Sequence, residues 1–310
     1  MNAASLPATM RVFERGWLSS NNILFFGSGS GCGPATLVDS GYLTHAPQTL
    51  ALIERALDGR PLERLINTHL HSDHCGGNAA LQARYGCRTL IPAAEAAKVR
   101  AWDEDALSFK ATGQQCERFG FDATLAPGDA LVLGGMDWQV LGAPGHDPHS
   151  LVFYCPAEGI LISADALWQN GFGVIFPELE GQSGFAETRA TLALIASLDI
   201  RLVIPGHGAP FTDVKPALAR AFSRLEYLQA DPVRNAENAV KVMLKFLLLE
   251  RRHFALDALP AMFASNPVIE GARLRYLDKN PAELAEWAVC SLVRSGAARR
   301  DGTQLVNHDL

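Results

Sequence analysis

Short apolar segments bounded by Gly, Pro or Asp recur along the chain as far as about residue 214, and they constrain the fold more than any other feature. Their length and their content of Val, Ile and Leu are typical of strands. The predicted strands cover residues 22–26, 35–39, 64–67, 88–91, 130–133, 138–141, 150–154, 159–163 and 201–204. Helical patterns lie between them at 47–57, 77–85, 93–102 and 184–198, and Ser183 is the predicted N-cap of the last one. Strands mixed with helices predict an α/β fold in which outer helices cover layered sheets.

The pattern changes near residue 215, where helices begin to dominate. Helices are predicted at 216–229, 233–252, 256–264 and 281–295, followed by a turn-rich tail that a terminal β wing would fit. Residues 1–214 carry a net charge of −9, whereas residues 215–310 carry +3. We therefore predict two domains, a catalytic region at 1–214 and a small, mainly helical appended region at 215–310.

The composition limits the class of protein. The chain has 310 residues, of which 48% are hydrophobic and 19% are charged, and this balance excludes an intrinsically disordered protein. Its most apolar helical stretch, residues 242–249, is interrupted by Lys245 and is far shorter than the ~20 residues that a membrane-spanning helix needs. The first thirty residues lack the features of an export signal, so a cytoplasmic location without membrane association is expected.

The segment that follows the predicted strand at 64–67 concentrates metal-binding residue types. His69 and His71 are two positions apart and share one side if the strand's alternation persists. Asp73 and His74 come next, where Gly76 and Gly77 permit a sharp turn into a helix, so their side chains can address a neighbouring point. Two adjacent metal positions are therefore possible, and imidazole with carboxylate suits zinc, iron or manganese.

Further donors follow later strands. His146 lies beyond the strand at 138–141, Asp165 beyond the strand at 159–163, and His207 beyond the strand at 201–204. Each lies just past an apolar run, at the loop edge where sites built on strands gather. An isolated histidine is usually a surface or core residue, but incidental residues have no reason to occupy successive strand ends. The sequence therefore predicts one site that collects all of these donors.

Taken together, His-x-His-x-Asp-His with Gly-Gly, then Gly-His146, Asp165 and Gly-His207, resembles the metallo-β-lactamase superfamily over about residues 20–212. The resemblance implies an αββα sandwich with two divalent metal ions on one edge, zinc being favoured over iron or manganese. By motif, one ion would be held by His69, His71 and His146. The other would be held by Asp73, His74 and His207, with Asp165 bridging both. The appended region resembles the winged-helix-like extension of a branch that holds unassigned hydrolases and RNA-cleaving members.

Such a site implies hydrolysis. Two cations that share a water lower its pKa to about 7, and a metal-bridging hydroxide could then attack a small ester, thioester, lactone or related substrate. Asp73 would hold the hydroxide and return its proton to the leaving group. A glyoxalase II would be expected to carry Gly-His-Glu-Tyr-Thr near the last ligand, whereas this chain has Gly-His207-Gly-Ala-Pro. Specificity for a glutathione thioester is therefore in doubt.

Two alternatives remain open. One is a metal-dependent endoribonuclease, which the appended region suggests, although the net charge of −9 on the catalytic region should repel a polyanion and favours a small-molecule substrate. The other is a persulfide dioxygenase-like oxygenase with one iron, which would use fewer of the seven donors. In the hydrolase interpretation, the appended region is expected to frame the mouth of the site or to mediate formation of a homodimer.

The residues after Asp165 are aromatic and rich in glycine, and they are too irregular for a helix. Their position predicts a hydrophobic lid or pocket wall formed by Trp168, Phe172 and Phe176. His149, three residues after His146, is a further candidate for contact with the substrate.

Overall fold

The computed structural model describes residues 6–27 and 34–308. Within these ranges the strands form three sheets, two of which face each other. The six-stranded sheet has the order β1 (Met10–Phe13), β2 (Asn22–Phe25), β3 (Ala35–Val38), β4 (Leu62–Ile66), β5 (Arg88–Pro92) and β6 (Ala123–Leu125). The five-stranded sheet has the order β11 (Leu202–Pro205), β10 (Ile160–Ala164), β9 (Leu151–Cys155), β8 (Met136–Gly142) and β7 (Ala130–Leu133).

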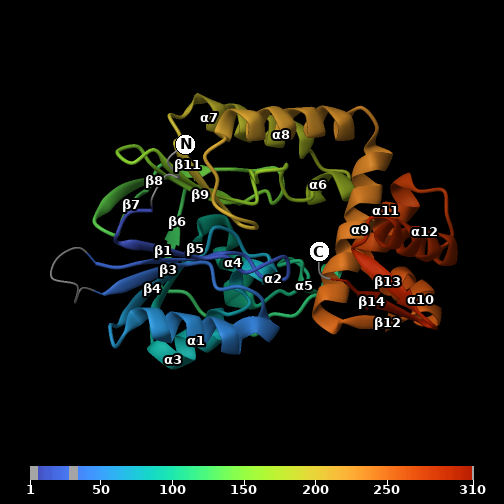
Figure 1. Cartoon of the computed structure of the whole chain (residues 1–310), viewed down its shortest axis with the longest axis horizontal. Coiled ribbons are helices and arrows are strands. Elements are labelled where there is room, and N and C mark those ends of the chain that lie inside the picture. Colours follow the sequence, from blue (N-terminus) through green and yellow to red (C-terminus); the bar gives the residue numbers. More distant parts are fainter. Residues whose placement is uncertain (1–5, 28–33, 309–310) are drawn as a thin grey trace.

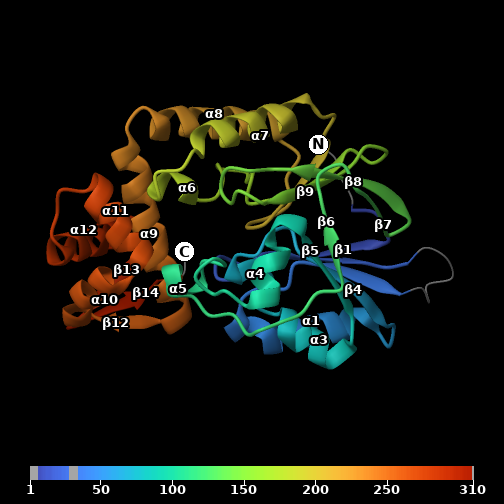
Figure 2. The same ribbon diagram turned by 180° about the vertical axis from the view of Figure 1, so that it is seen from behind.

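The two large sheets pack face to face and are covered by helices on their outer sides, as Figures 1 and 2 show. Strands β9, β10 and β11 are buried along their whole length, which explains why they read as continuous apolar runs rather than alternating ones. Helices α1 (Ala46–Leu57) and α3 (Asn78–Tyr85) cover the first sheet, and α7 (Phe185–Ser197) and α8 (Val214–Gln229) cover the second. The predicted αββα sandwich is confirmed.

Strand direction brings the motif loops to one edge of the sandwich. Strand β4 runs parallel to β3 and β5, and β10 runs parallel to β11. The carboxyl ends of parallel neighbours meet at the same edge, where the loop after each strand is free to carry functional side chains. The segments that follow β4, β8, β10 and β11 contain every predicted metal ligand.

The appended region lies at one end of the sandwich (Figure 1). It contains α9 (Pro232–Arg251), α10 (Leu259–Ser265), α11 (Pro267–Tyr276), α12 (Pro281–Arg294) and the small sheet β12 (His253–Ala255), β14 (Gln304–Asn307) and β13 (Ala298–Asp301). Helix α12 begins with a capping box between Asn280 and Glu283. One apolar core joins these elements and includes Val174 of the catalytic region.

Helix α8 shows how closely the two regions are joined. Its buried residues, among them Ala217, Ala221 and Leu225, share an apolar cluster with α7 and the second sheet. The two-domain division at residues 214 and 215 stays a prediction, because a shared cluster of this kind is compatible with more than one boundary. The winged-helix likeness also stays a prediction, although β13 and β14 do form a hairpin at the chain's end.

All of the predicted strands are present, but the prediction missed the strands β1, β6 and β12 and the helices α2 (Ser72–Cys75), α5 (Phe109–Thr112), α6 (Phe176–Leu179) and α11. The predicted N-cap of α7 is wrong. Ser183 Oγ donates instead to the Glu187 carboxylate, and the backbone N–H groups of Gly184 and Phe185 both donate to Glu178 Oε1 at 2.8 Å. Glu178 is a charged acceptor at the positive end of the helix, so it competes well with a neutral hydroxyl for this position. In the described ranges no helix is both long and apolar enough to cross a membrane.

Candidate metal centre

The seven predicted ligands come together at the edge of the sandwich, in two adjoining groups. His69, His71 and His146 form the first group, and Asp73, His74, Asp165 and His207 form the second. Within each group the candidate ligand atoms all lie within 4.8 Å of one another. Asp73 and His74 belong to the four-residue helix α2 (Ser72–Cys75), and the other five lie in loops.

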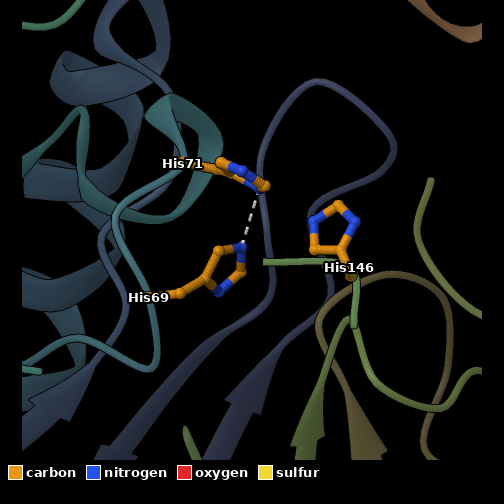
Figure 3. Close-up of side chains that lie close together, drawn as sticks. All are labelled: His69, His71 and His146. Carbon is orange, nitrogen blue, oxygen red and sulfur yellow. Dashed lines mark hydrogen bonds between the residues drawn. The ribbon is translucent and has the colours of Figure 1, made fainter. Parts of the chain in front are cut away.

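The three histidines of the first group point toward a common space (Figure 3). His69 Nε2 lies 3.1 Å from His71 Nδ1, and the ring centroids of His71 and His146 are 4.5 Å apart. His69 and His146 lie in loops from different sheets, so the site closes only when the two sheets have packed against each other.

The second group is arranged around carboxylates. His207 Nε2 lies 3.1 Å from Asp73 Oδ2, and His74 Nε2 lies 3.4 Å from Asp165 Oδ1. The other oxygen of Asp165, Oδ2, lies 3.4 Å from His146 Nε2 in the first group. Asp165 is thus positioned between the two groups and offers one oxygen to each. Donors on a tetrahedral metal ion with bonds of 2.0–2.1 Å are about 3.3 Å apart, so this spacing suits a shared cation better than direct hydrogen bonds.

The hydrogen bonding of His146 and His74 indicates whether these residues fit a metal ion. His146 donates through Nδ1 to the Val174 carbonyl at 2.5 Å, and His74 Nδ1 lies 2.7 Å from Asp39 Oδ2. In the neutral imidazole these contacts place the proton on Nδ1, so that Nε2 of each ring is free to bind a metal. Both Nε2 atoms are buried and have no hydrogen-bond partner. Buried polar atoms are nearly always satisfied, so two orphaned acceptors beside a carboxylate fit a divalent metal site.

Asp39 supports this arrangement from behind, and the sequence reasoning missed it. Its Oδ1 accepts from the Thr68 backbone N–H at 2.9 Å, and its Oδ2 accepts from Thr68 Oγ1 at 2.8 Å. Thr68 Oγ1 in turn lies 3.1 Å from His69 Nδ1, so Asp39 orients His74 directly and His69 through Thr68. The sequence offered one signal for Asp39, namely that a carboxylate residue ends the strand predicted at 35–39. In the structure, Asp39 has a backbone φ of 56°, a conformation that few residues other than glycine adopt.

The histidines of the first group are held neutral. Burial lowers the pKa of His69 well below its usual value, and the neighbouring His74 and His71 lower it further. Burial likewise lowers the pKa of His146 to about 4, with His71 adding to the effect. A neutral imidazole is the form that binds a metal, so these side chains need lose no proton at neutral pH.

The second group is dominated by charge. Burial alone would lower the pKa of His74, but the carboxylates of Asp165 and Asp39 raise it well above its usual value. Burial alone would raise the pKa of Asp165, but His207 and His74 hold it well below its usual range. The carboxylates therefore stay ionised and demand positive charge nearby, which protons on the imidazoles or a divalent cation can supply.

Replacing Asp39 by asparagine is expected to lower the affinity for divalent metal by about 10- to 100-fold. The substitution keeps the side-chain volume but removes the charge that orients His74. Competition with a chromophoric chelator measures the affinity. Asp58→Asn is the matched control, because exposed Asp58 has a similar φ of 49° and lies away from the site. Equal affinity in the wild type and in the Asp39 variant would show that Asp39 does not support the ligands.

Gly206 lies against the ligands so closely that no side chain fits. A Cβ atom there would overlap Asp165 Oδ1 and lie 3.0 Å from His74 Cε1. We expect Gly206→Ala to displace Asp165 and to lower the bound metal by about one ion per chain, since donors must keep within ~0.2 Å of their bonding distances. Gly120→Ala is the control, since nothing lies within 4 Å of its added carbon. Elemental analysis after gel filtration gives the stoichiometry, and an unchanged metal content in Gly206→Ala would contradict the prediction.

A cavity of about 100 Å³ opens onto both groups. The predicted wall residues Trp168, Phe172 and Phe176 all line it. Trp168 Nε1 donates to Asp165 Oδ1 at 3.2 Å, and the Phe176 ring centroid lies 5.4 Å from that of His71. His149 is not among the described residues that line this cavity; its Nδ1 contacts Glu95 Oε1 beside a neighbouring pocket. Its contact with the substrate stays a prediction.

Trp17 is a second residue that the sequence reasoning missed. Its ring stacks on His207 with centroids 5.5 Å apart and planes inclined by 10°, and it meets Trp168 edge to face at 5.3 Å. Trp17 is 55% exposed and lines both the central cavity and an outer groove of about 600 Å³. No periodicity or motif marks it, because it lies in the loop before β2, far along the chain from His207 and Trp168.

The chain was compared with known proteins. Residues 15–207 match the family model described as the metallo-beta-lactamase superfamily. A hydroxyacylglutathione hydrolase from Brucella anthropi is 29% identical over 183 residues, which cover 55% of this chain and 59% of that protein. One from Chelativorans sp. is 30% identical over 135 residues, covering 43% of this chain and 46% of that protein. The matched segments thus span only about half the length of these curated relatives.

Solved structures resemble the whole chain. A metallo-beta-lactamase family protein from Thermus thermophilus is 20% identical with a TM-score of 0.58, and the match covers 98% of this chain and 100% of that one. A beta-lactamase domain protein from Burkholderia ambifaria is 22% identical with a TM-score of 0.56, covering 99% of this chain and 97% of that one. At these identities the likeness concerns the fold alone, and it extends through the appended region.

Proposed function

The chain belongs to the metallo-beta-lactamase superfamily, and on that premise we propose that it is a metal-dependent hydrolase of a small ester, thioester, lactone or related substrate. His69, His71 and His146 would hold one divalent ion. Asp73, His74 and His207 would hold the other, with Asp165 touching both. Zinc is the proposed metal, because imidazole and carboxylate donors at these spacings suit it; iron and manganese are the alternatives.

One observation carries this proposal: seven donors from separate segments meet, and the unpartnered Nε2 atoms of His74 and His146 flank the oxygens of Asp165. A structural cluster of histidines would pair its nitrogen atoms with protein groups instead. Divalent ions bound there supply a water of lowered pKa and Lewis acidity toward a scissile carbonyl oxygen.

Residues of the chain would then orient the attacking water and give a proton to the leaving group. Asp73 has Oδ2 at 3.1 Å from His207 Nε2, and its side chain is 12% exposed toward the cavity, so it can accept a proton from water and deliver it to a leaving group. Burial alone would raise the pKa of Asp73, but His74 and His207 lower it, which keeps the carboxylate ionised and able to accept. Trp168 fixes Asp165 through its indole N–H. The aromatic walls exclude bulk water.

The cavity favours a small substrate. About 100 Å³ beside the donors accommodates an acyl group, and aromatic side chains form much of the wall. Helix α9 contributes Val242, Met243 and Phe246 to this wall, which supports the view that the appended region frames the mouth of the site. The curated relatives named hydroxyacylglutathione hydrolase support a thioester in particular, although the chain departs from the glyoxalase II pattern after His207.

The endoribonuclease alternative rests on a separate observation. Lys241, Lys245 and Arg294 line the outer groove, which gives it a basic character against the acidic catalytic region. Lys245 Nζ, however, donates to the Ala297 carbonyl and to Asn307 Oδ1, both at 2.7 Å, so part of this charge is already engaged within the chain. The dioxygenase alternative needs one iron and would use fewer of the seven donors.

An activity panel with defined metal content tests the proposal. Protein loaded with zinc, iron or manganese is assayed against thioesters, lactones, β-lactams and a short RNA, and its metal is counted. We expect about two zinc ions per chain and hydrolysis of an ester-like substrate. Cleavage of RNA alone would establish the ribonuclease alternative, and one iron with oxygen consumption would establish the dioxygenase.

A further inference from the structure

A half-buried arginine lines the cavity that the metal ligands also line. Arg224 belongs to α8, and it lines the cavity together with Asn238 of α9. Arginine keeps its positive charge in proteins, so this wall carries a cation wherever the guanidinium is directed. None of the reactions considered above gives this charge a role.

Two donor atoms of this pair, Arg224 Nε and Asn238 Nδ2, lack acceptors. Arg224 Nη2 donates to Asn238 Oδ1 at 3.3 Å, and its guanidinium carbon lies 5.6 Å from the Phe172 ring centroid. Arg224 Nε and Asn238 Nδ2 are both buried and have no hydrogen-bond partner. Two unsatisfied donors on neighbouring side chains require the same kind of group, an oxygen acceptor, and each costs free energy while it remains unpaired.

No carboxylate in the described part of the chain lies within 4.0 Å of Arg224. Arg220, one turn earlier in the same helix, contrasts with it: its Nη2 lies 3.1 Å from Asp213 Oδ2 at the surface. Burial lowers the pKa of Arg224, which reflects the cost of holding an unpaired cation away from water. A half-buried arginine in a cavity, without an anion in its own chain, is expected to receive one from a ligand.

The loop between Asp165 and α6 (Phe176–Leu179) relates this pair to the metal centre. The Cβ position of Gly171 lies 3.0 Å from Arg224 Cδ, and the Cβ position of Gly173 would overlap the His146 ring. Residues two apart in a chain are separated by at most about 7 Å between their Cα atoms. Arg224, His71 and His146 also line one cavity, so a small molecule inside it can contact both the guanidinium and the first group of donors.

We propose that Arg224 and Asn238 bind a carboxylate on the substrate, so that the preferred substrates are esters or thioesters of a dicarboxylic acid whose free carboxylate lies a few bonds from the scissile carbonyl. The planar guanidinium and the amide N–H offer donors in the geometry that a carboxylate accepts. This inference rests on the proposed hydrolase function, since it assigns the substrate class of the same site. Arg224 would be a substrate-binding residue that sets specificity.

Paired substrates provide the test. The metal-loaded full chain is assayed with succinyl and butyryl thioesters of one thiol, which share chain length and leaving group. We expect kcat/KM to be about 10- to 100-fold higher for the succinyl compound, as for hydrogen bonds to a charged group. Arg224→Gln should remove this preference mainly by raising KM for the succinyl thioester, and should lower kcat/KM far less for the butyryl thioester, which has no second carboxylate. An equal loss on both thioesters would indicate a packing role and overturn the proposal.

Two further variants guard against a general effect on folding. Asn238→Asp places a carboxylate beside Arg224 within the chain, and it should abolish the preference for the succinyl thioester while keeping the guanidinium in place. Lys215→Gln removes an exposed cation from the same helix and should behave as wild type. Retention of the preference in both Arg224→Gln and Asn238→Asp would overturn the proposal. So would cleavage of a short RNA that depends on Arg224, because the cation would then serve a phosphate.

A binding measurement separates this proposal from the reaction on which it rests. Succinate and butyrate each offer one carboxylate to the metals, but only succinate has a second. Calorimetry should show tighter binding of succinate to the wild type, by a factor that Arg224→Gln removes. If no thioester is hydrolysed and this difference persists, the proposed hydrolysis fails while the anion site stands. If hydrolysis proceeds without any difference between the two acids, the anion site fails.

Discussion

Replacing Asp165 by alanine is expected to lower kcat/KM on the best substrate of the panel by at least about 1000-fold, since it removes both a ligand and the group that holds the two metals in register. Asp165 presents Oδ2 to His146 and Oδ1 to His74, each at 3.4 Å, so neither group of donors keeps its full set in the variant. Bound metal should fall from about two ions per chain to one or none. Steady-state kinetics and elemental analysis on the same preparation measure both quantities.

Asp137→Ala is the matched control for this experiment. Asp137 is an exposed aspartate on β8, on the strand that leads toward His146, and it lies in neither group of donors. We expect it to retain wild-type activity and metal. Full activity in the Asp165 variant, with two metals still bound, would refute the bridging role and the mechanism that depends on it.

Removing the metal with a strong chelator is expected to abolish hydrolysis and to lower the melting temperature by roughly 10 °C. A ligand at a thousand times its Kd stabilises the native state by about 4 kcal/mol, and each kcal/mol is worth about 2–4 °C in a domain of this size. The buried carboxylates of Asp73 and Asp165 would otherwise depend on protonated imidazoles for compensation. Scanning calorimetry with and without added zinc measures the shift, and recovery of activity on adding metal excludes irreversible damage.

The size of this shift should depend on pH. In metal-free protein burial alone would lower the pKa of His74, but Asp165 and Asp39 raise it well above its ordinary 6.5. A group whose pKa is raised by folding contributes its full stabilisation below its unfolded pKa and loses it as pH rises through the folded value. The metal-free protein should therefore lose stability on going from about pH 6 to pH 9, and the gap to the zinc-loaded protein should widen. A gap that stays constant over this range would show that protons do not replace the metal.

The metal ligands could be predicted because each one lies in a short motif or directly after a strand that the local sequence reveals. His69, His71, Asp73 and His74 lie within one short segment, and His146, Asp165 and His207 each follow a recognisable strand. The convergence of these loops then follows from the direction of the strands, which the layered pattern already implies.

The surroundings of the ligands could not be predicted, because they depend on approaches between distant segments. Gly206 looks like an ordinary loop glycine until the oxygen of Asp165 is found against it. Arg224 looks like one of several basic residues on a helix, and only the absence of an acceptor around its Nε distinguishes it. The N-cap of α7 was mistaken for a similar reason, since Glu178 reaches that helix from outside the segment that the capping rule considers.

The metal donors and much of the remaining cavity wall come from different elements, and this separation bears on how such enzymes acquire new substrates. The donors come from loops of the sandwich, whereas Arg224, Asn238 and Val242 come from the two long helices α8 and α9. On the proposed function, we expect substitutions on those helices to redirect the choice of acyl group without disturbing the metal ligands. The loop from Asp165 to Phe176 is the exception, because it touches both sides, and a change there alters chemistry and selectivity together. Selection for a new substrate should therefore accumulate changes first on α8 and α9 and last in this loop.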